Sequence, residues 1–188
     1  ITYAPHRFVS IASLSPEIAG RTISVHGMSK NFGLSGLRIG FLVAPSPEVF
    51  EGLIEASHAR TTAWGAATLS QVAAQAAYEK GWPFLEAFLR HLTRVRDYAA
   101  GRLNAMPGVT CRVPQATYLL FPDVSAHGLS SAEMARYLLE EARVAVVPGS
   151  ARWFGPAAEG HVRIAFPTSM KIVAESMDRI ERALRKRA

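Results

Sequence analysis

Two basic residues with different chemical abilities stand eight positions apart, Lys30 and Arg38, in the segment 22–43. An arginine guanidinium offers a planar fork of donors that suits a phosphate group. A lysine amine that loses its proton becomes a nucleophile and can form an imine with a carbonyl compound. Gly33 and Gly36 lie between them and allow the chain to turn tightly around a small ligand. The segment therefore indicates an imine-forming Lys30 and a phosphate-binding Arg38, although each residue taken singly is typical of a surface charge.

A third candidate, Arg163, lies in the apolar run 161–166, between Val162 and Ile164. A charged side chain in a strand that is otherwise suited to burial is costly unless it is paired. An anionic ligand would supply that pairing. A structural salt bridge, or a place at the edge of a sheet, is the alternative.

The elements that must position Lys30 follow from the pattern around it. Residues 22–43 are expected to form a strand, a loop and a second strand, and residues 39–43 have the short apolar run of a buried strand. Ser46 followed by Pro47 predicts the start of a helix. Four of its apolar residues share one face and are expected in the core: Val49, Phe50, Leu53 and Ile54.

The rest of the chain alternates between helix and strand. An alanine-rich helix over 66–79 is expected to pack in the interior, and a long amphipathic helix runs from Pro83 to about Ala105. After the break at residues 106–108, we expect a mixed sheet with helices on one side. Its strands are predicted at 109–113, 118–124, 144–147 and 161–166, and its helices at 131–142 and 170–187.

Composition limits the classes of function. The 188 residues are 49% hydrophobic, so the chain can bury a sizeable core. The formal net charge is +6, but the basic residues are scattered, and we expect no nucleic-acid partner. The single cysteine, Cys111, allows no disulfide within the chain, which fits a reducing, cytoplasmic environment. No apolar run approaches the roughly 20 residues that cross a bilayer, so we predict no membrane partner, and we predict no bound metal.

The run Gly-Met-Ser-Lys-Asn-Phe-Gly-Leu-Ser-Gly-Leu-Arg-Ile-Gly over 27–40 resembles the lysine signature of the class I/II, fold type I aminotransferases that depend on pyridoxal 5'-phosphate. The resemblance implies that Lys30 is the Schiff-base lysine and proton shuttle, and that Arg38 binds the cofactor phosphate. Many members carry Ser or Thr three residues before the lysine, where this chain has Gly27. Ser29 is the expected substitute.

A second stretch, residues 146–150 followed by 160–166, resembles the family segment whose arginine binds the substrate α-carboxylate, which implies that role for Arg163. Residues 152–154 are then expected to cover the substrate side chain. The family also places a loop near the partner subunit's active site, which here falls on Thr61, Thr62 and Trp64. A capped helix start is the alternative for that loop.

The resemblance implies an α/β fold, comprising the C-terminal part of the fold type I large domain and the small α+β C-terminal domain. The expected ranges are 1–82 for the large domain, 83–106 for the interdomain helix and 107–188 for the small domain. It also implies a homodimer that moves an amino group between an amino acid and a 2-oxo acid. The chain would represent the C-terminal half of such a protein and lack much of the cofactor pocket, which argues against activity of the chain alone.

Two alternatives remain open at this stage. Gln115 and Thr117 depart from the commoner Gly-[Ala/Gly]-Phe-Tyr pattern, and variants of this kind occur in the subgroup that includes carbon-sulfur lyases, so β-elimination is the first. The second is an aminotransferase-like domain that senses an effector in a transcription regulator. The sequence shows no helix-turn-helix pattern that would favour it.

Overall fold

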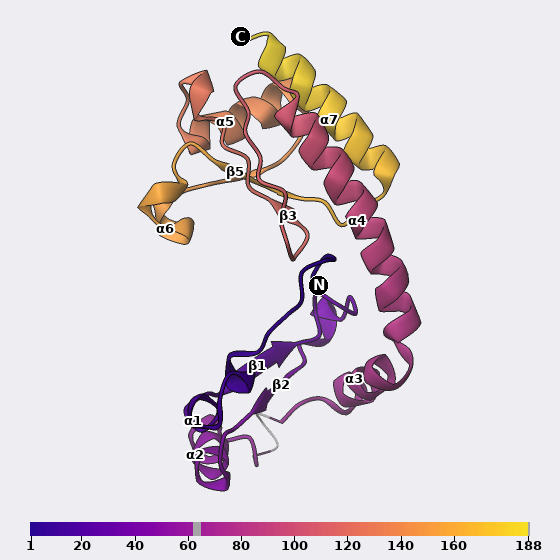
Figure 1. The fold of residues 1–188 in the computed structure, drawn as a ribbon, viewed down its shortest axis with the longest axis vertical. Coiled ribbons are helices and arrows are strands. Elements are labelled where there is room, and N and C mark those ends of the chain that lie inside the picture. Colours follow the sequence, from indigo (N-terminus) through magenta and orange to yellow (C-terminus); the bar gives the residue numbers. More distant parts are fainter. Residues whose placement is uncertain (62–64, 188) are drawn as a thin grey trace. The chain divides into compact units, whose positions relative to one another are not determined.

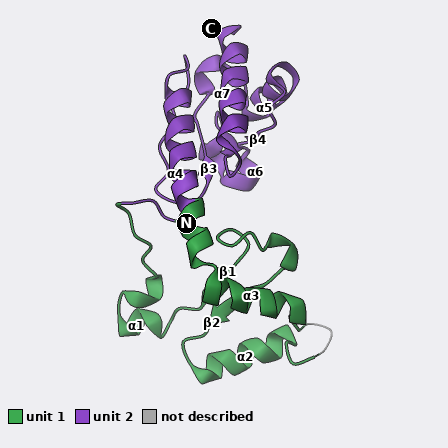
Figure 2. Cartoon of the chain, turned by 90° about the vertical axis from the view of Figure 1, so that its right-hand side faces the viewer, with its two compact units in different colours: residues 1, 5–88 green, residues 2–4, 89–188 purple. Residues whose placement is uncertain are grey.

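The computed structural model describes residues 1–61 and 65–187, and Figure 1 shows its elements in chain order. The chain divides into two compact units, coloured separately in Figure 2. Unit 1 comprises residue 1 and residues 5–88, and unit 2 comprises residues 2–4 and 89–188. Helix α4 (Trp82–Asn104) begins in unit 1 and continues in unit 2, and it agrees with the long helix predicted from the sequence. The division into functional domains at 82 and 106 stays a prediction.

Unit 1 is built around a pair of antiparallel strands, β1 (Ser24–Gly27) and β2 (Gly40–Val43). The register joins Ser24 to Val43 at one end and Gly27 to Gly40 at the other. The two ends of the segment that carries Lys30 are therefore held together. The helices of the unit are α1 (Pro16–Ala19), α2 (Pro47–Ser57) and α3 (Thr68–Lys80), with the first part of α4.

Helix α2 begins where the sequence predicts. The Ser46 side chain accepts a hydrogen bond from the Val49 backbone N–H at 3.2 Å, and Pro47 occupies the first turn. The predicted core face of this helix is wrong, because α2 has no buried residue and Phe50 is 45% exposed.

Two further expectations of burial in unit 1 are wrong. Every residue of β2 is exposed, although its apolar run is typical of a buried strand. In α3 only Ser70 is buried, although the helix is rich in alanine. Apolar composition predicts burial only when another element covers the face, and the described residues of unit 1 leave these faces uncovered.

Unit 2 contains a three-stranded sheet in the order β3-β5-β4. Both pairs are antiparallel, so the expected mixed sheet is wrong. The strands are also shorter than predicted: β3 is Leu119–Leu120, β4 is Val147–Pro148 and β5 is Val162–Ala165. The strand expected at 109–113 is reduced to a single bridge from Thr110 to Asp123.

Together with the second part of α4, three further helices supply most of the buried hydrophobic residues of unit 2. They are α5 (Ser131–Tyr137), which continues as a π-helix over Leu138–Ala142, then α6 (Ala151–Phe154) and α7 (Met170–Arg185). Both ribbon views show α7 lying beside α4 (Figures 1 and 2). Arg102 of α4 forms ion pairs with Asp178 and Glu181 of α7 at 2.7 and 2.9 Å. The apolar face predicted for α7 is confirmed, since each of its four residues is buried: Val173, Met177, Ile180 and Leu184.

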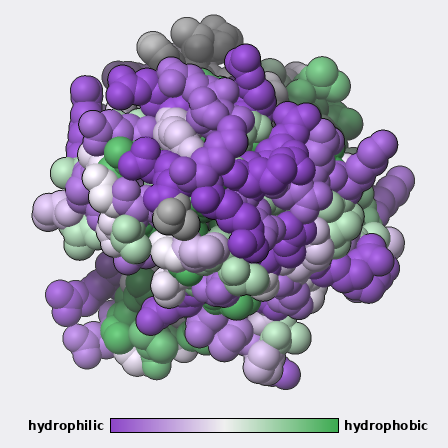
Figure 3. Space-filling view, turned by 90° about the horizontal axis from the view of Figure 1, so that it is seen from above, coloured by the Kyte–Doolittle hydropathy of each residue, from purple (hydrophilic) through white to green (hydrophobic). Residues whose placement is uncertain are grey.

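Two further observations concern the surface of the protein and its helices. The face drawn in Figure 3 is mostly hydrophilic, with smaller apolar areas. Among the described residues, no helix is both long and apolar enough to cross a membrane.

Candidate functional site

The lysine loop, residues 28–39, is closed by strands β1 and β2. At Gly40 the strands approach so closely that an added Cβ would lie 2.6 Å from the carbonyl oxygen of His26. A side chain at this position would push the strands apart, because that oxygen belongs to the backbone. Glycine is therefore needed here to fix where the loop ends.

Two apolar side chains anchor the lysine loop while its polar groups stay accessible. Met28 and Phe32 are buried, and the Phe32 ring lies 6.0 Å from the Tyr78 ring and 6.1 Å from the Trp82 ring. Lys30, between the two anchors, is exposed. Phe32 was not predicted as an anchor, although the spacing of Met28 and Phe32 on either side of the lysine was a signal for it.

Arg38 stands at the other end of the lysine loop in an unusual conformation. Its φ is +47°, in the left-handed region, which is uncommon for a residue with a β-carbon. The preceding carbonyl, that of Leu37, accepts a hydrogen bond from the buried Ser70 hydroxyl at 2.7 Å. This bond ties Arg38 to helix α3. Its partner, Ser70, was also missed in the sequence.

Three polar side chains of the lysine loop are candidates for binding a ligand. Among residues 1–61 and 65–187, the side chains of Lys30, Arg38 and Ser29 make no hydrogen bond or ion pair with one another or with other residues. Ser29 is half-buried, and its carbonyl accepts a hydrogen bond from the Ser35 hydroxyl at 3.3 Å. An amine, a guanidinium and a hydroxyl together suit a ligand that carries a carbonyl and a phosphate. The structure thus holds these three residues in one loop, and their roles stay predictions.

Arg163 lies in the central strand of unit 2. Its neighbours Val162 and Ile164 are buried on one face of β5, whereas Arg163 points to the other face and is half-buried. The register places Arg163 opposite Val147 of β4. The strand is central, so the alternative of a sheet-edge position does not apply among the described strands.

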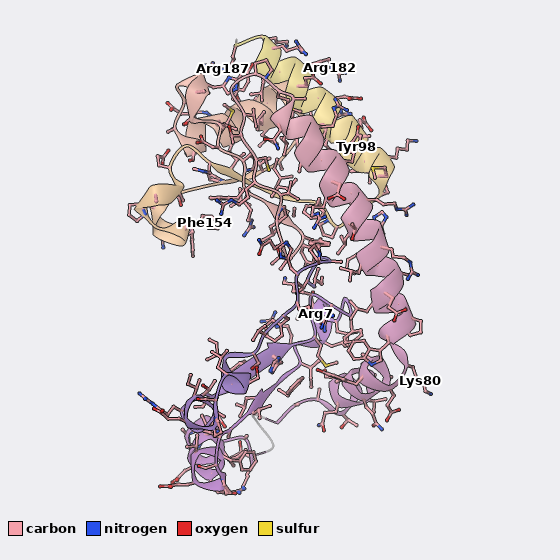
Figure 4. The ribbon with its side chains drawn as sticks, in the orientation of Figure 1. Arg7, Lys80, Tyr98, Phe154, Arg182 and Arg187 are labelled. Atoms are coloured by element: carbon pink, nitrogen blue, oxygen red, sulfur yellow. The ribbon has the colours of Figure 1, made fainter. Side chains whose placement is uncertain are left out.

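One ring of a small aromatic cluster lies beside the Arg163 side chain. Its Cζ lies 5.8 Å from the ring centroid of Phe154, which projects from the end of α6 (Figure 4). Phe121 lies 5.3 Å from Phe154 and 5.1 Å from His161, measured between ring centroids. The predicted covering segment 152–154 therefore brings one ring to Arg163, and Phe121 and His161 were not expected. Phe121 follows β3 and His161 precedes β5, so the two rings meet only because these strands pair, which the sequence does not show.

Buried polar atoms without a partner occur in both candidate regions. Among the described residues, two such side-chain atoms are found, Asn31 Oδ1 and Arg163 Nε. Asn31 follows Lys30 directly. A buried donor or acceptor that lacks a partner is destabilising, and such groups are rare in native proteins. A bound ligand would satisfy them.

The segment predicted to approach a partner subunit is only partly described. Thr61 is exposed, and its hydroxyl donates to the carbonyl of His58 at 2.8 Å. Thr62 and Trp64 lie outside the described residues. This prediction stays untested.

Residues 1–180 match the family described as "Aminotransferase class I and II". The chain belongs to this family. Its similarity to the aspartate aminotransferase of Pyrococcus horikoshii is 35% identity over 184 residues, covering 97% of the chain and 45% of the relative. The similarity to aromatic-amino-acid aminotransferase 2 of Thermococcus litoralis is 39% over 180 residues, covering 95% and 44%. The chain thus spans slightly less than half the length of these relatives.

A solved structure supports the same assignment. A putative aminotransferase from Clostridium difficile 630, described as bound to pyridoxal phosphate, matches with a TM-score of 0.90 and 31% identity. The match covers 98% of this chain and 47% of that one. The α/β fold predicted from the sequence is therefore confirmed as that of about half of an aminotransferase chain.

Proposed function

We propose that this chain is part of an aminotransferase that uses pyridoxal 5'-phosphate to move an amino group between an amino acid and a 2-oxo acid. The observation that carries the proposal is the match of residues 1–180 to the aminotransferase family, and the buried Nε of Arg163, which has no partner among the described residues, suits an anion such as a substrate carboxylate. The side chains of Lys30, Arg38 and Ser29, which have no partner among the described residues, also support it. A homodimer is proposed on family membership alone.

The residues of the lysine loop fit the cofactor by their chemistry. Lys30 would bind its carbonyl carbon, and Arg38, with Ser29, would bind its phosphate. When bound, pyridoxal 5'-phosphate supplies an electron sink for breaking a bond at the substrate Cα. The Lys30 amine would move a proton between the substrate Cα and the carbonyl carbon of the cofactor.

Arg163 orients the substrate. Its guanidinium can bind both oxygens of a carboxylate, which fixes the direction of the remaining bonds at Cα. The ring of Phe154, 5.8 Å from Arg163 Cζ, would lie beside that ion pair and limit the access of water on one side. A lower local dielectric strengthens the ion pair between Arg163 and the substrate carboxylate.

The test uses the complete protein with added cofactor. A visible absorbance band that borohydride fixes as a covalent adduct on Lys30, identified by peptide mass spectrometry, is the expected result. Lys30→Ala should remove the band and lower turnover at least about a thousandfold, because binding and proton transfer both depend on the amine. Lys80→Ala, an exposed lysine at the end of α3 (Figure 4), is the matched control and should keep both.

Arg163→Ala separates substrate binding from cofactor binding. It should keep the visible band and raise KM for the amino acid about 10- to 100-fold, as expected for losing a hydrogen bond to a charged group. Full activity of Lys30→Ala would contradict the proposal. Release of pyruvate and ammonia without a 2-oxo acid acceptor would instead indicate β-elimination.

A further inference from the structure

The N-terminal residues hold one loop of unit 2 through both backbone and side chain. Thr2 forms a β-bridge with Ala116, and the Tyr3 N–H donates to the carbonyl of Gln115 at 2.9 Å. The Tyr3 hydroxyl donates to the carbonyl of Thr117 at 2.6 Å. Tyr3 itself is only 1% exposed, whereas Gln115 and Thr117, whose carbonyls accept these bonds, are exposed residues.

Arg96 completes the attachment from helix α4. Its Cζ lies 4.1 Å from the centroid of the Tyr3 ring, and its Nη1 donates to the carbonyl of Pro114 at 3.2 Å. The carbonyls of Pro114, Gln115 and Thr117 are thus all bound by Tyr3 or Arg96. The loop is held at three points by two side chains and one backbone group.

The loop that they hold is strained. Thr117 has a φ of +67°, in the left-handed region, which is a genuine outlier for a β-branched residue. Such a conformation persists only where surrounding contacts impose it. The hydroxyl of Tyr3 binds the carbonyl of this residue.

The strained loop leads directly into the strand pair that carries Arg163. Leu119 of β3 pairs with Ala165 of β5, and the Phe166 N–H donates to the carbonyl of Tyr118 at 3.1 Å. A shift of the loop is therefore transmitted to β5 through backbone hydrogen bonds. Arg163 lies two residues before Ala165 on the same face of that strand.

We propose that Tyr3 is a positioning residue for substrate binding: its hydroxyl fixes the loop 114–118, and through β3 and β5 this fixes the direction of the Arg163 guanidinium. The inference rests on the proposed function in assigning the substrate carboxylate to Arg163. Tyr3 itself touches neither substrate nor cofactor.

The chemistry of the hydroxyl suits this role over the whole physiological range. Burial raises the pKa of Tyr3 to about 12. The hydroxyl therefore keeps its proton and remains a donor to Thr117 at any pH at which the protein would work.

Tyr3→Phe is the decisive variant, because it removes the hydroxyl and keeps the ring beneath Arg96. Unit 2 offers a closely matched control in Tyr137, whose hydroxyl donates to the carbonyl of Ala183 at 2.8 Å. Arg187 (Figure 4) lies over the Tyr137 ring at 5.2 Å, just as Arg96 lies over that of Tyr3. Tyr137→Phe thus loses the same kind of bond in another part of the unit.

Two measurements on the complete protein test the inference. In steady-state kinetics, Tyr3→Phe should raise KM for the amino acid about three- to tenfold and leave kcat within about twofold, whereas Tyr137→Phe should leave both unchanged. In hydrogen exchange followed by mass spectrometry, Tyr3→Phe should speed exchange in peptides covering 114–121 and 161–166. Tyr137→Phe should not affect these peptides.

The outcomes separate the inference from the proposed function. Equal effects of the two variants on KM, or unchanged exchange at 161–166 in Tyr3→Phe, would overturn the positioning role. If the wild-type protein shows no transamination, the proposed function fails, and the exchange measurement still decides whether Tyr3 holds the strand of Arg163.

Discussion

The two units bury their apolar residues to very different extents. Among the described hydrophobic residues that are buried, Met28 and Phe32 are those that belong to unit 1, and the others belong to unit 2. Unit 1 instead exposes apolar side chains on both of its strands, such as Val25 at 78% and Val43 at 54%. Unit 2 therefore has a hydrophobic core of its own, whereas unit 1 has an anchored loop on a small strand pair.

The difference extends to the two candidate regions. Lys30 and Arg38 are exposed and depend on a few contacts, chiefly those of Phe32 and Ser70. Arg163 lies on a central strand with buried neighbours. We infer that a single substitution displaces the lysine loop more easily than it displaces β5, the strand that carries Arg163.

The largest expected effect tests the core of unit 2. Leu92 of α4 is fully buried, so Leu92→Ala should lower the free energy of unfolding of unit 2 by about 2–5 kcal/mol. Leu42→Ala in unit 1 is the matched control, and because Leu42 is 43% exposed its cost should stay below about 1 kcal/mol. Urea unfolding followed by hydrogen exchange in peptides of each unit would measure both. Equal losses would contradict the comparison.

A smaller effect tests the anchor of the lysine loop. A Cβ at Gly81 would lie 2.9 Å from Phe32 Cε1 and would also meet the carbonyl oxygen of Ala77. Gly81→Ala should therefore displace the Phe32 ring and destabilise unit 1 by about 1–3 kcal/mol. Gly52→Ala, in helix α2, meets nothing within 4 Å and should be neutral or slightly stabilising.

The same variant should also weaken cofactor binding. Titration of Gly81→Ala and Gly52→Ala with pyridoxal 5'-phosphate, followed by visible absorbance, compares their affinities. A Gly81→Ala protein that binds as tightly as Gly52→Ala would mean that Phe32 does not position the loop.

The smallest expected effect concerns how the folding stability of unit 2 depends on pH. Hydrogen bonds from the Ser125 side chain and backbone lower the pKa of Asp123 below its usual 3.8. A lowered pKa in the folded state stabilises the protein above pH 3.8, and this contribution is lost as pH falls through the folded value. The carboxylates whose pKa is lowered all lie in unit 2: Asp123, Glu133 and Glu181.

Lowering the pH should therefore reduce the free energy of unfolding of unit 2, because these three carboxylates become protonated. Asp123→Asn should reduce, by less than about 1 kcal/mol, the loss in the free energy of unfolding of unit 2 that urea unfolding measures as the pH falls below about 4. An unchanged pH profile in this variant would show that Asp123 makes no such contribution.

The sequence alone determined the features that depend on near neighbours. The start of α2 at Ser46, the buried face of α7 and the long helix α4 all follow from a few residues at helical spacing or in a cap. The run of 27–40 likewise fixed the family and the candidate residues of the lysine loop, because glycines, lysine and arginine occur together in a fixed order.

Only the tertiary structure decided which surfaces are buried and which distant residues meet. Nothing local distinguishes the exposed β2 from a buried strand, since burial depends on what covers it. The bond from Tyr3 to Thr117 joins residues 114 positions apart, and the ring of Phe154 reaches Arg163 only because α6 packs near β5. Such contacts depend on the register and packing of whole elements, which short-range patterns in a sequence do not specify.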